Sequence, residues 1–363
     1  MRILHIANHV KESGNGIVNV MVDLACAQAA AGHEVAVVSA GGGYEGLLAR
    51  KGVRHYRVDQ SRRPVRLARA ALRFRRAVSE FRPDIVHAHM VTGALMARLL
   101  RGWSPYRLVT HVHNKFQKSS DLMKVGDVTI AVSGAVRDDM AKRGIRREKL
   151  RIVRNATIGS PRTADREPAA LDGRAIVTVA GLYERKGVGD LIEAFDRVAE
   201  THPDAVLHII GEGPDRPLFE ARAARSPYRD RIRFEGFRTD GQRWIKAAEV
   251  FVLASHTDAF PLALIEAREA GSAIVATNVD GIPELLDFGR AGVLVPPRDA
   301  EAMAGAIRGM LDDEARRQAY RRRASEGLDG FRTSRMAEET IRIYDELLPV
   351  SAGLAADAAG GGK

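Results

Sequence analysis

The sequence predicts an α/β protein made of two doubly wound, parallel-sheet domains. Its 363 residues correspond to about two domains of ordinary size. Short runs rich in Val, Ile, Leu and Ala alternate with helical patterns along most of the chain, which is typical of strands buried on both faces of a parallel sheet. The alternation stops at residues 158–174, where Pro161 and Pro168 stand among charged residues without periodicity. We interpret this stretch as the linker between the two domains.

The first domain is expected at residues 1–160 and begins directly with a strand. The runs expected to form strands cover residues 3–7, 34–39, 84–89, 108–113, 128–132 and 150–153. Helical patterns separate most of them and are clearest at residues 17–31, 65–81 and 92–101. This alternation predicts parallel strands with helices packed on the sheet.

The second domain is expected at residues 161–333, where the alternation resumes. Its expected strands cover residues 176–180, 206–210, 232–235, 250–254, 273–276 and 292–295. A final helix at about residues 334–348 is expected to pack back on the first domain. Residues 351–363 are rich in Ala and Gly and are expected to form a disordered tail.

Composition excludes several classes of protein. Apolar residues make up 45% of the chain and charged residues 28%, so the chain is neither collagen-like nor disordered. The single cysteine, Cys26, excludes a disulfide framework and a thiolate zinc cluster, and we expect it to pack as a small apolar side chain. The sequence has neither a run near the roughly 18 apolar residues of a membrane span nor a signal peptide. We expect a cytoplasmic protein, at most peripheral on the inner face of the plasma membrane.

The basic surplus belongs to the first half of the chain. Residues 1–160 carry 28 Lys and Arg against 12 Asp and Glu, a net +16, whereas residues 161–363 carry 28 against 34, a net −6, which sum to the overall +10. Such asymmetry suggests an anionic partner: a membrane face, a phosphorylated lipid or nucleic acid. The arginines concentrate between Arg62 and Arg82. This region is either a solvated helix face or a surface that docks on anionic phospholipid.

Two glycine turns follow predicted strands, where open α/β sheets bind anions through backbone N–H groups. Gly14 and Gly16 stand before the first helix and lack the third glycine of a dinucleotide fingerprint. Gly211 and Gly213 follow the strand at 206–210, and Pro214 suits the first position of the next helix. Each turn is either an approach for a phosphate or ordinary tight packing between strand and helix.

Charged side chains also follow strands of the second half. Arg185 and Lys186 come after the strand at 176–180 and suit a diphosphate as well as they suit a solvated loop. Asp258 precedes a helix expected to start at Pro261, and Glu266 lies inside that helix among Leu, Ile and Ala. The helix N-terminus attracts a phosphate. An unpaired carboxylate among apolar residues is costly, so these two acids are candidates for binding sugar hydroxyls.

Four histidines close two predicted strands, as His87 and His89 and as His111 and His113. The two-residue period of a strand puts both members of each pair on one face. Three readings stay open: a metal site, cleft residues that hydrogen-bond a substrate, and satisfied core histidines. We expect substrate contact, with His89 and His111 on the acceptor, and no metal.

The run from Asp258 to Gly271, continuing to Glu284, closely resembles the second-domain signature of the family 4 glycosyltransferases. Further landmarks fall in the family's order at residues 84–89, 109–113, 185–187, 210–214 and 292–297. The likeness covers nearly the whole chain. It implies the GT-B fold, in which two doubly wound Rossmann-like domains face each other across a cleft. It also implies retaining transfer of a sugar from a nucleoside-diphosphate sugar to a hydroxyl of a lipid-linked glycan, lipopolysaccharide or polysaccharide.

The resemblance implies roles for single residues. Glu266 matches the acid that holds the donor ribose, and Asp258 matches the acid that contacts the donor sugar, with a shorter side chain. Lys186 matches the lysine that grips the diphosphate, and His113 matches the active-site histidine near the transferred sugar. The catalytic residues implied are His113, Lys186 and Asp258. The donor-binding residues implied are Gly16, Arg185, Lys186, Gly211, Gly213, Asp258, Phe260, Pro261, Leu262 and Glu266.

The chain departs from the family pattern in ways that leave the donor open. Gly181 stands where the family has an arginine for the diphosphate, and the loop at Gly14–Gly16 lacks the usual pair of adjacent glycines. Asn155 opens a changed landmark, Asn-Ala-Thr-Ile. No Asp-x-Asp occurs in the sequence, so we expect no metal and no cofactor besides the donor, most readily a UDP- or GDP-sugar.

Three other functions share parts of this pattern. A sugar-nucleotide epimerase of the GT-B kind shares the fold. A nicotinamide-dependent dehydrogenase is disfavoured because Gly-x-Gly-x-x-Gly is absent. A basic nucleic-acid-binding module would use the first half, but no recognised motif with interleaved aromatics is present, and we expect no nucleic acid partner.

Overall fold

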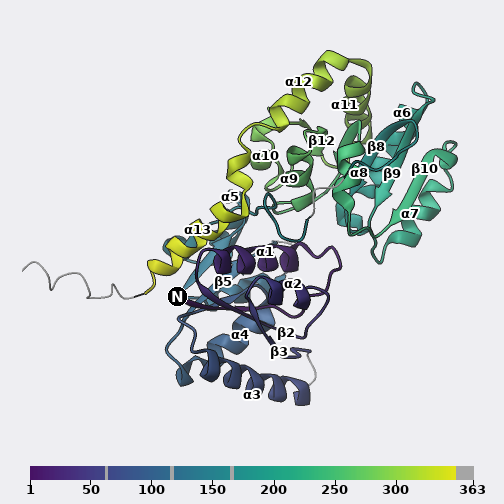
Figure 1. Cartoon of the computed structure of the whole chain (residues 1–363). Coiled ribbons are helices and arrows are strands. Elements are labelled where there is room, and N and C mark those ends of the chain that lie inside the picture. The colour runs from purple at the N-terminus through teal and green to yellow at the C-terminus, as the bar shows by residue number, and fades with distance from the viewer. Residues whose placement is uncertain (62–63, 115–117, 164–166, 349–363) are drawn as a thin grey trace, which may run out of the picture.

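The computed structural model describes residues 1–61, 64–114, 118–163 and 167–348. Each half of the chain forms one parallel sheet covered by helices on both faces, and the two α/β units lie one above the other (Figure 1). Arg62, Arg63 and the tail expected at residues 351–363 lie outside the described residues.

The first sheet has the order β3-β2-β1-β4-β5-β6-β7, and its neighbouring strands are parallel. The chain starts in the middle, moves to one edge and then crosses to the other, which makes the sheet doubly wound. The strands are β1 (Arg2–Ile6), β2 (Glu34–Ser39), β3 (Arg54–Arg57), β4 (Ile85–Ala88), β5 (Arg107–Val112), β6 (Val128–Ala131) and β7 (Leu150–Ile152).

The second sheet repeats this plan in the order β10-β9-β8-β11-β12-β13, again with parallel neighbours. Its strands are β8 (Arg174–Val179), β9 (Ala205–Ile210), β10 (Ile232–Gly236), β11 (Val250–Leu253), β12 (Ala273–Thr277) and β13 (Val293–Val295). The carboxyl ends of strands from both sheets border the same cleft. The two-domain α/β prediction is therefore confirmed.

Strand β3 is an element that the apolar pattern does not predict. Its sequence Arg-His-Tyr-Arg is polar, and its side chains are exposed or half-buried because the strand lies at the edge of the sheet. The other described strands overlap the predicted runs to within about two residues.

Helices cover both faces of the first sheet. Ile3 packs with α1 and α13, whereas the next residue, Leu4, packs with α3 and α4. The helices of this unit are α1 (Gly16–Ala30), α2 (Glu45–Arg50), α3 (Pro64–Phe81), α4 (Val91–Leu100) and α5 (Gly134–Lys142). Cys26 is buried on α1 among apolar side chains, as expected.

The second sheet is enclosed in the same way. Phe195 on α6 and Met303 on α11 cover one face, while Ile245 on α8 and Leu264 on α9 cover the other. The helices are α6 (Val188–Ala199), α7 (Arg216–Ala223), α8 (Gly241–Ala247), α9 (Leu262–Glu269), α10 (Ile282–Leu285), α11 (Ala300–Asp312), α12 (Glu314–Ala324) and α13 (Thr333–Asp345). Pro214 does not begin a helix: α7 begins two residues later, after Asp215, with Pro217 in its first turn.

The chain passes between the units twice, and the two passages meet. Ile158 in the outgoing segment forms a parallel bridge with Arg332 in the returning segment. The returning chain enters α13, which packs along α1 of the first unit and appears as the yellow helix beside it (Figure 1). In the outgoing segment Arg162 makes a two-pronged ion pair with Asp23 of α1, at 2.8 and 2.7 Å. Ser160 also donates to Asp23, at 2.6 Å.

Candidate active site

A cleft of about 940 Å³ separates the two units, which is the size of a small-ligand site. One wall comes from the loop before α1 and from the end of β5. The other comes from the loops after β8 and β9 and from the start of α9. The residues expected at the donor that line this cleft are Gly16, Arg185, Lys186, Gly211, Asp258, Phe260, Pro261, Leu262 and Glu266.

The glycine loop of the first unit presents the start of α1 to the cleft. Gly14 has φ +67°, a left-handed conformation that favours glycine. Asn15 is the N-cap of α1, and its side chain accepts from the backbone N–H of Ile17 at 3.0 Å. A Cβ at Gly14 would lie 3.1 Å from the Phe237 ring of the second unit. The loop therefore brings N–H groups close to the facing wall, where an anion is favoured.

Lys186 is held by a carboxylate in the wall of the second unit. Its Nζ donates to Asp258, and both side chains are largely buried. The same carboxylate accepts from Ser255 at 3.3 Å, and the backbone N–H of Asp258 donates to Asp280 at 2.9 Å. Within the chain the Asp258 carboxylate therefore contacts Lys186 and Ser255, and its expected contact with a sugar stays a prediction.

Helix α9 begins beside this pair. Pro261 is its N-cap and Leu262 its first residue, one residue later than expected. The carbonyl of Phe260 accepts from Asn155 of the first unit at 2.9 Å, so the two walls are connected at the helix start. The N–H groups at this end give the helix a positive tip at the cleft, where an anion is favoured.

Glu266 lies in the second turn of α9, partly buried in the cleft wall. Burial raises its pKa to about 7, against the pull of Arg162 and a hydrogen bond with Gln242, which both lower it. The carboxyl therefore changes protonation near neutral pH. Its ionised form can accept two hydroxyl hydrogens, as the cis-diol of a ribose provides.

We expect Glu266→Gln to stabilise the protein by an amount that grows as the pH rises from about 5 to about 7. Folded Glu266 keeps its proton up to a pKa of about 7, whereas its ordinary value is 4.5. The wild type therefore loses stability across this window, and glutamine does not titrate. The gain levels off above pH 7 at no more than about 3–4 kcal/mol. Urea unfolding of both proteins from pH 5 to 8 measures it, and a pH-independent difference would contradict the prediction.

Two glycines after β9 differ in their role. Gly211 lines the cleft with φ +145°, and a Cβ there would lie 1.9 Å from the carbonyl oxygen of Ala180. Gly213 does not line the cleft: its Cβ would meet the Leu182 carbonyl oxygen at 2.2 Å. Gly213 thus packs closely between two loops, and its expected donor contact stays a prediction.

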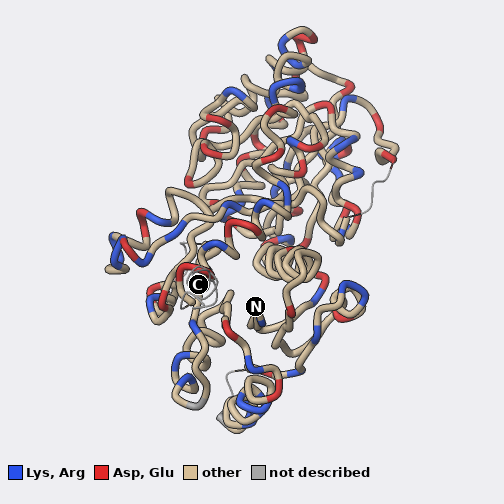
Figure 2. Tube along the Cα trace, turned by 60° about the vertical axis from the view of Figure 1, so that its left-hand side comes forward, with Lys and Arg blue, Asp and Glu red and all other residues tan. Residues whose placement is uncertain are grey.

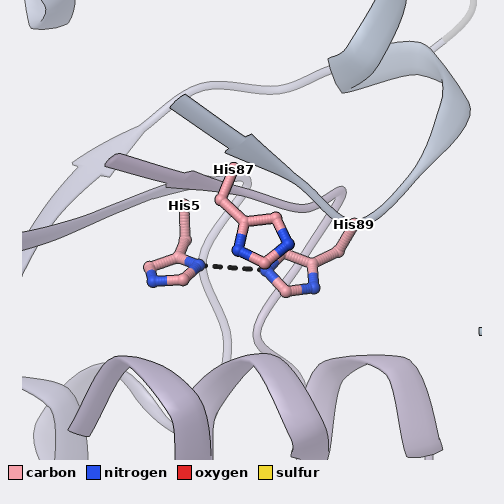
Figure 3. Close-up of side chains that lie close together, drawn as sticks. All are labelled: His5, His87 and His89. Carbon is pink, nitrogen blue, oxygen red and sulfur yellow. Dashed lines mark hydrogen bonds between the residues drawn. The ribbon is translucent and has the colours of Figure 1, made fainter. Parts of the chain in front are cut away.

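Only part of the predicted histidine group reaches the cleft. His113, at the end of β5, lines it. His89 is 2% exposed and His111 1%, and neither is among the cleft residues. Their side chains turn into the layer between the sheet and α1 and do not reach the cleft, and the expectation that these two bind the acceptor stays a prediction. Figure 3 shows His89 there with His5 and His87, above the turns of α1.

The buried histidines bring their nitrogens together without the form of a metal site. Two groups of three have ligand atoms within 4.8 Å of one another. However, the rings of His87 and His89 stack with centroids 4.3 Å apart and planes 25° apart, and those of His111 and His113 do the same at 4.1 Å and 24°. Imidazole lone pairs lie in the ring plane, so stacked rings direct them side by side rather than at one ion.

The structure adds cleft cations that the sequence pattern did not indicate. Arg162 comes from the linker, and Arg238 follows β10 and stacks on Trp244 at 5.4 Å. Both line the cleft together with Arg185 and Lys186. They add positive charge to a cleft in which Gly181 replaces the family arginine. Arg162 stands in no motif, so positive charge near the linker was its one signal in the sequence. Arg238 lies two residues after Gly236, which has φ +71° at the end of β10, and this glycine turn was the signal that could have found it.

Comparison with known proteins assigns this architecture. A family model described as glycosyl transferases group 1 matches residues 173–313, and one described as glycosyltransferase family 4 matches residues 14–157. The glycogen synthase of Mycobacterium tuberculosis is 29% identical over 312 residues, 77% of this chain and 73% of its own. The phosphatidyl-myo-inositol mannosyltransferase of Mycolicibacterium smegmatis is 32% identical over 180 residues, 48% of this chain and 45% of its own.

A solved structure agrees in fold. Anabaena HepE in complex with UDP-glucose superposes with a TM-score of 0.81 and 17% identity, covering 95% of this chain and 100% of its own. Two facing doubly wound units with a cleft between them form the GT-B fold, and the matching family models identify the chain as a glycosyltransferase of this fold. The chain belongs to glycosyltransferase family 4. The epimerase, dehydrogenase and nucleic-acid readings are set aside in favour of this enzyme class.

Proposed function

We propose that the enzyme transfers a sugar, with retention at the anomeric carbon, from a nucleoside-diphosphate sugar to a hydroxyl of a lipid-linked glycan, lipopolysaccharide or polysaccharide. One observation carries the proposal. A single cleft collects the glycine loop, Lys186, the positive tip of α9 and Glu266. These groups match the parts of a sugar nucleotide, with cations and N–H groups for the diphosphate and a carboxylate for the ribose.

The donor lies mainly on the second unit in this proposal. Glu266 accepts the ribose hydroxyls, while Lys186 and the N-terminus of α9 hold the diphosphate. Asp258 keeps Lys186 in position and accepts from a hydroxyl of the transferred sugar. UDP is the first nucleotide to test, since HepE of similar fold was solved with UDP-glucose, and GDP is the second.

Charge on the leaving diphosphate drives the proposed mechanism. As the glycosidic C–O bond lengthens, electrons move onto the phosphate oxygen, and Lys186 together with backbone N–H groups stabilises that charge. The acceptor hydroxyl forms the new bond on the face that the diphosphate leaves, and its proton passes to the departing phosphate oxygen. No protein nucleophile and no metal enters this scheme. Closure of the two units around the donor excludes water.

A panel of UDP-, GDP- and ADP-sugars in a thermal-shift assay tests the donor, because a bound ligand stabilises the folded state by mass action. We expect one nucleotide to raise the melting temperature of the wild type, Glu266→Ala to lose that shift, and His113→Ala to keep it while losing transfer. Product analysis with and without an acceptor follows, with the anomeric configuration read by NMR. Stabilisation by none of the panel, or an inverted product, would overturn the proposal.

The proposed acceptor is anchored in a membrane, and helix α3 supplies the contact surface. Four exposed arginines lie along one stripe of this helix, at spacings of three and four residues: Arg66, Arg69, Arg73 and Arg76. Val65 and Leu72, each 65% exposed, lie beside them. Figure 2 shows the basic turns of this helix at the foot of the molecule. An amphipathic basic face of this kind suits an anionic bilayer.

A groove next to α3 adds to the same surface. It measures about 780 Å³ and is lined by arginines, including Arg75 and Arg82, together with apolar side chains such as Leu100. Cations above an apolar floor suit a phospholipid headgroup and the start of its chains. Within the described residues, none of the helices has both the length and the apolar character required to span a bilayer, so the proposed attachment is peripheral.

We expect Arg69→Glu/Arg73→Glu to weaken binding to anionic vesicles by at least about 30-fold, because each of the two basic residues near the surface contributes about 1 kcal/mol. Co-sedimentation with phosphatidylglycerol-containing and purely phosphatidylcholine vesicles measures the effect. The matched control Arg316→Glu/Arg322→Glu changes the net charge equally through exposed residues of α12 and should bind as the wild type does. Equal binding of the wild type to both vesicles would exclude this surface.

A further inference from the structure

Five histidines form a column across β1, β4 and β5: His5, His87, His89, His111 and His113. Neighbouring rings lie with centroids 4.1–5.5 Å apart. The catalytic scheme uses only the last of them, at the cleft. The remaining four are buried. Within the described residues, neither nitrogen of His111 nor Nε2 of His87 has a hydrogen-bond partner, whereas the other nitrogens of these four rings do. The hydrogen bonds of the column therefore depend on which nitrogen of each ring carries the proton.

Part of the column forms a continuous hydrogen-bonded chain. Gln28 Oε1 lies 2.7 Å from His5 Nε2, and His5 Nδ1 lies 3.0 Å from His89 Nε2, the contact drawn as a dashed line in Figure 3. His89 Nδ1 lies 3.1 Å from His113 Nε2. Each of these rings uses one nitrogen toward α1 and the other toward the cleft. His87 and His111 stack beside the chain without taking part in it.

A tyrosine on the last helix, α13, determines which atoms donate and which accept along this row of hydrogen bonds. Tyr344 Oη lies 2.5 Å from His87 Nδ1, a length typical of an O–H donor and shorter than an N–H donor gives. The tyrosine thus donates to His87, and its oxygen accepts from Gln28 Nε2 at 3.4 Å. Because the amide nitrogen of Gln28 faces Tyr344, its carbonyl oxygen faces His5 and can only accept.

Because the Gln28 oxygen can only accept, it determines which nitrogen carries the proton in each of the three histidine rings bonded in series. His5 donates Nε2–H to Gln28, so its Nδ1 is bare and accepts from His89 Nε2–H. His89 Nδ1 is then bare and accepts from His113 Nε2–H. This order requires neutral rings. Burial lowers the pKa of His5 to about 4 and that of His113 to about 3, and it holds the pKa of His89 well below its usual range.

We propose that Gln28, His5 and His89 are positioning residues that fix His113 as its Nε2–H tautomer and present a bare Nδ1 to the cleft. Within the described residues this nitrogen has no hydrogen-bond partner, and His113 lines the cleft, so Nδ1 is available to a ligand there. It accepts a hydrogen bond from a hydroxyl of the sugar being transferred. The inference deepens the proposed function and rests on it for the identity of that hydroxyl.

The tautomer itself can be read without any substrate. In protein labelled with ¹⁵N-histidine, long-range ¹H–¹⁵N spectra distinguish protonated from bare ring nitrogens, and the spectrum of His113→Asn identifies the signals of His113. We expect a bare Nδ1 and a protonated Nε2 at neutral pH, unchanged by EDTA. A protonated Nδ1 overturns the proposal, and so does a spectrum that depends on bound zinc. The result stands whether or not a sugar nucleotide is the substrate.

Two replacements of Gln28 then distinguish its role as a hydrogen-bond acceptor, which determines the tautomers, from its role in packing. Gln28→Met has similar size and cannot accept, whereas Gln28→Glu keeps an acceptor facing His5. For Gln28→Met we expect a mixture of His113 tautomers and about a tenfold loss in kcat, the effect of one hydrogen bond, with KM for the donor unchanged. Gln28→Glu should keep both the tautomer and kcat near the wild type.

The comparison overturns the proposal if both variants lose kcat equally while the tautomer of His113 stays the same, because Gln28 would then act through packing alone. Thermal melting of each variant verifies folding. If Gln28→Met does not fold, the wild-type spectrum and Gln28→Glu still decide the point. Absence of transfer with every sugar nucleotide would count against the proposed function and leave the assigned tautomer in place.

Discussion

Replacing Lys186 with alanine is expected to lower kcat by about 10²–10³-fold, the usual cost of removing one group that stabilises charge in a transition state. Lys186 is the cation that Asp258 holds at the cleft. In the proposed mechanism, its loss removes positive charge from the leaving diphosphate and leaves the Asp258 carboxylate, without its partner, next to that anion. Steady-state kinetics with the donor identified by thermal shift measures the effect, which should fall mainly on kcat.

Two variants test the assignment of this lysine. Lys186→Arg keeps the charge but changes the geometry, so it should retain more activity than the alanine variant. Asp258→Asn leaves the cation without its carboxylate and should lower kcat less than the loss of the cation does. A kcat within tenfold of the wild type for Lys186→Ala would show that another group stabilises the leaving diphosphate.

Asp23→Ala is expected to destabilise the protein by about 3–5 kcal/mol, since it leaves a buried guanidinium without its partner. Asp23 is fully buried and the Arg162 side chain is 7% exposed. Their double contact fixes the linker to α1. Burial raises the pKa of Asp23 while Arg162 lowers it. Denaturant unfolding at neutral pH, followed by fluorescence and circular dichroism, measures the loss.

A double variant separates two contributions to the free energy of unfolding: the cost of a buried charge without a partner, and the net stabilisation by the ion pair itself. Asp23→Leu/Arg162→Met removes both charges and fills the space with apolar groups, and we expect it to be more stable than Asp23→Ala. If the double variant is as unstable as the single one, the pair stabilises the fold in its own right. A loss below about 1 kcal/mol for Asp23→Ala would contradict the burial argument altogether.

Most of the fold follows from apolar runs because each buried strand must be apolar along its length. Residues 34–39 are such a run and form β2 with the predicted bounds. Strand β3 could not be predicted in this way, because an edge strand with half-exposed side chains needs no apolar run. Its place in the sheet comes from pairing with β2, a tertiary contact that local sequence does not encode.

Some residues of the candidate site could likewise be predicted from the sequence, and others could not. Lys186 and Glu266 stand in short motifs that follow strands, and the topology of parallel sheets brings strand ends together. The linker residue Arg162 reaches the cleft through a partner 139 residues away in sequence, which no local pattern indicates. For His89 and His111 the two-residue period gave the correct shared face, but it did not reveal that α1 covers this face.

The return of α13 to the first unit has a consequence for synthesis on the ribosome. Met336 and Tyr344 cover Ile3 and Ile85 of the first sheet, yet they are translated after the whole second unit. At about 5–20 residues per second, translation from β7 to α13 takes roughly ten to forty seconds. During this time the face of the first sheet that α13 covers stays exposed. The nascent first unit is thus incomplete until α13 has been translated, and a chain terminated before α13 would expose that apolar face to chaperones and proteases.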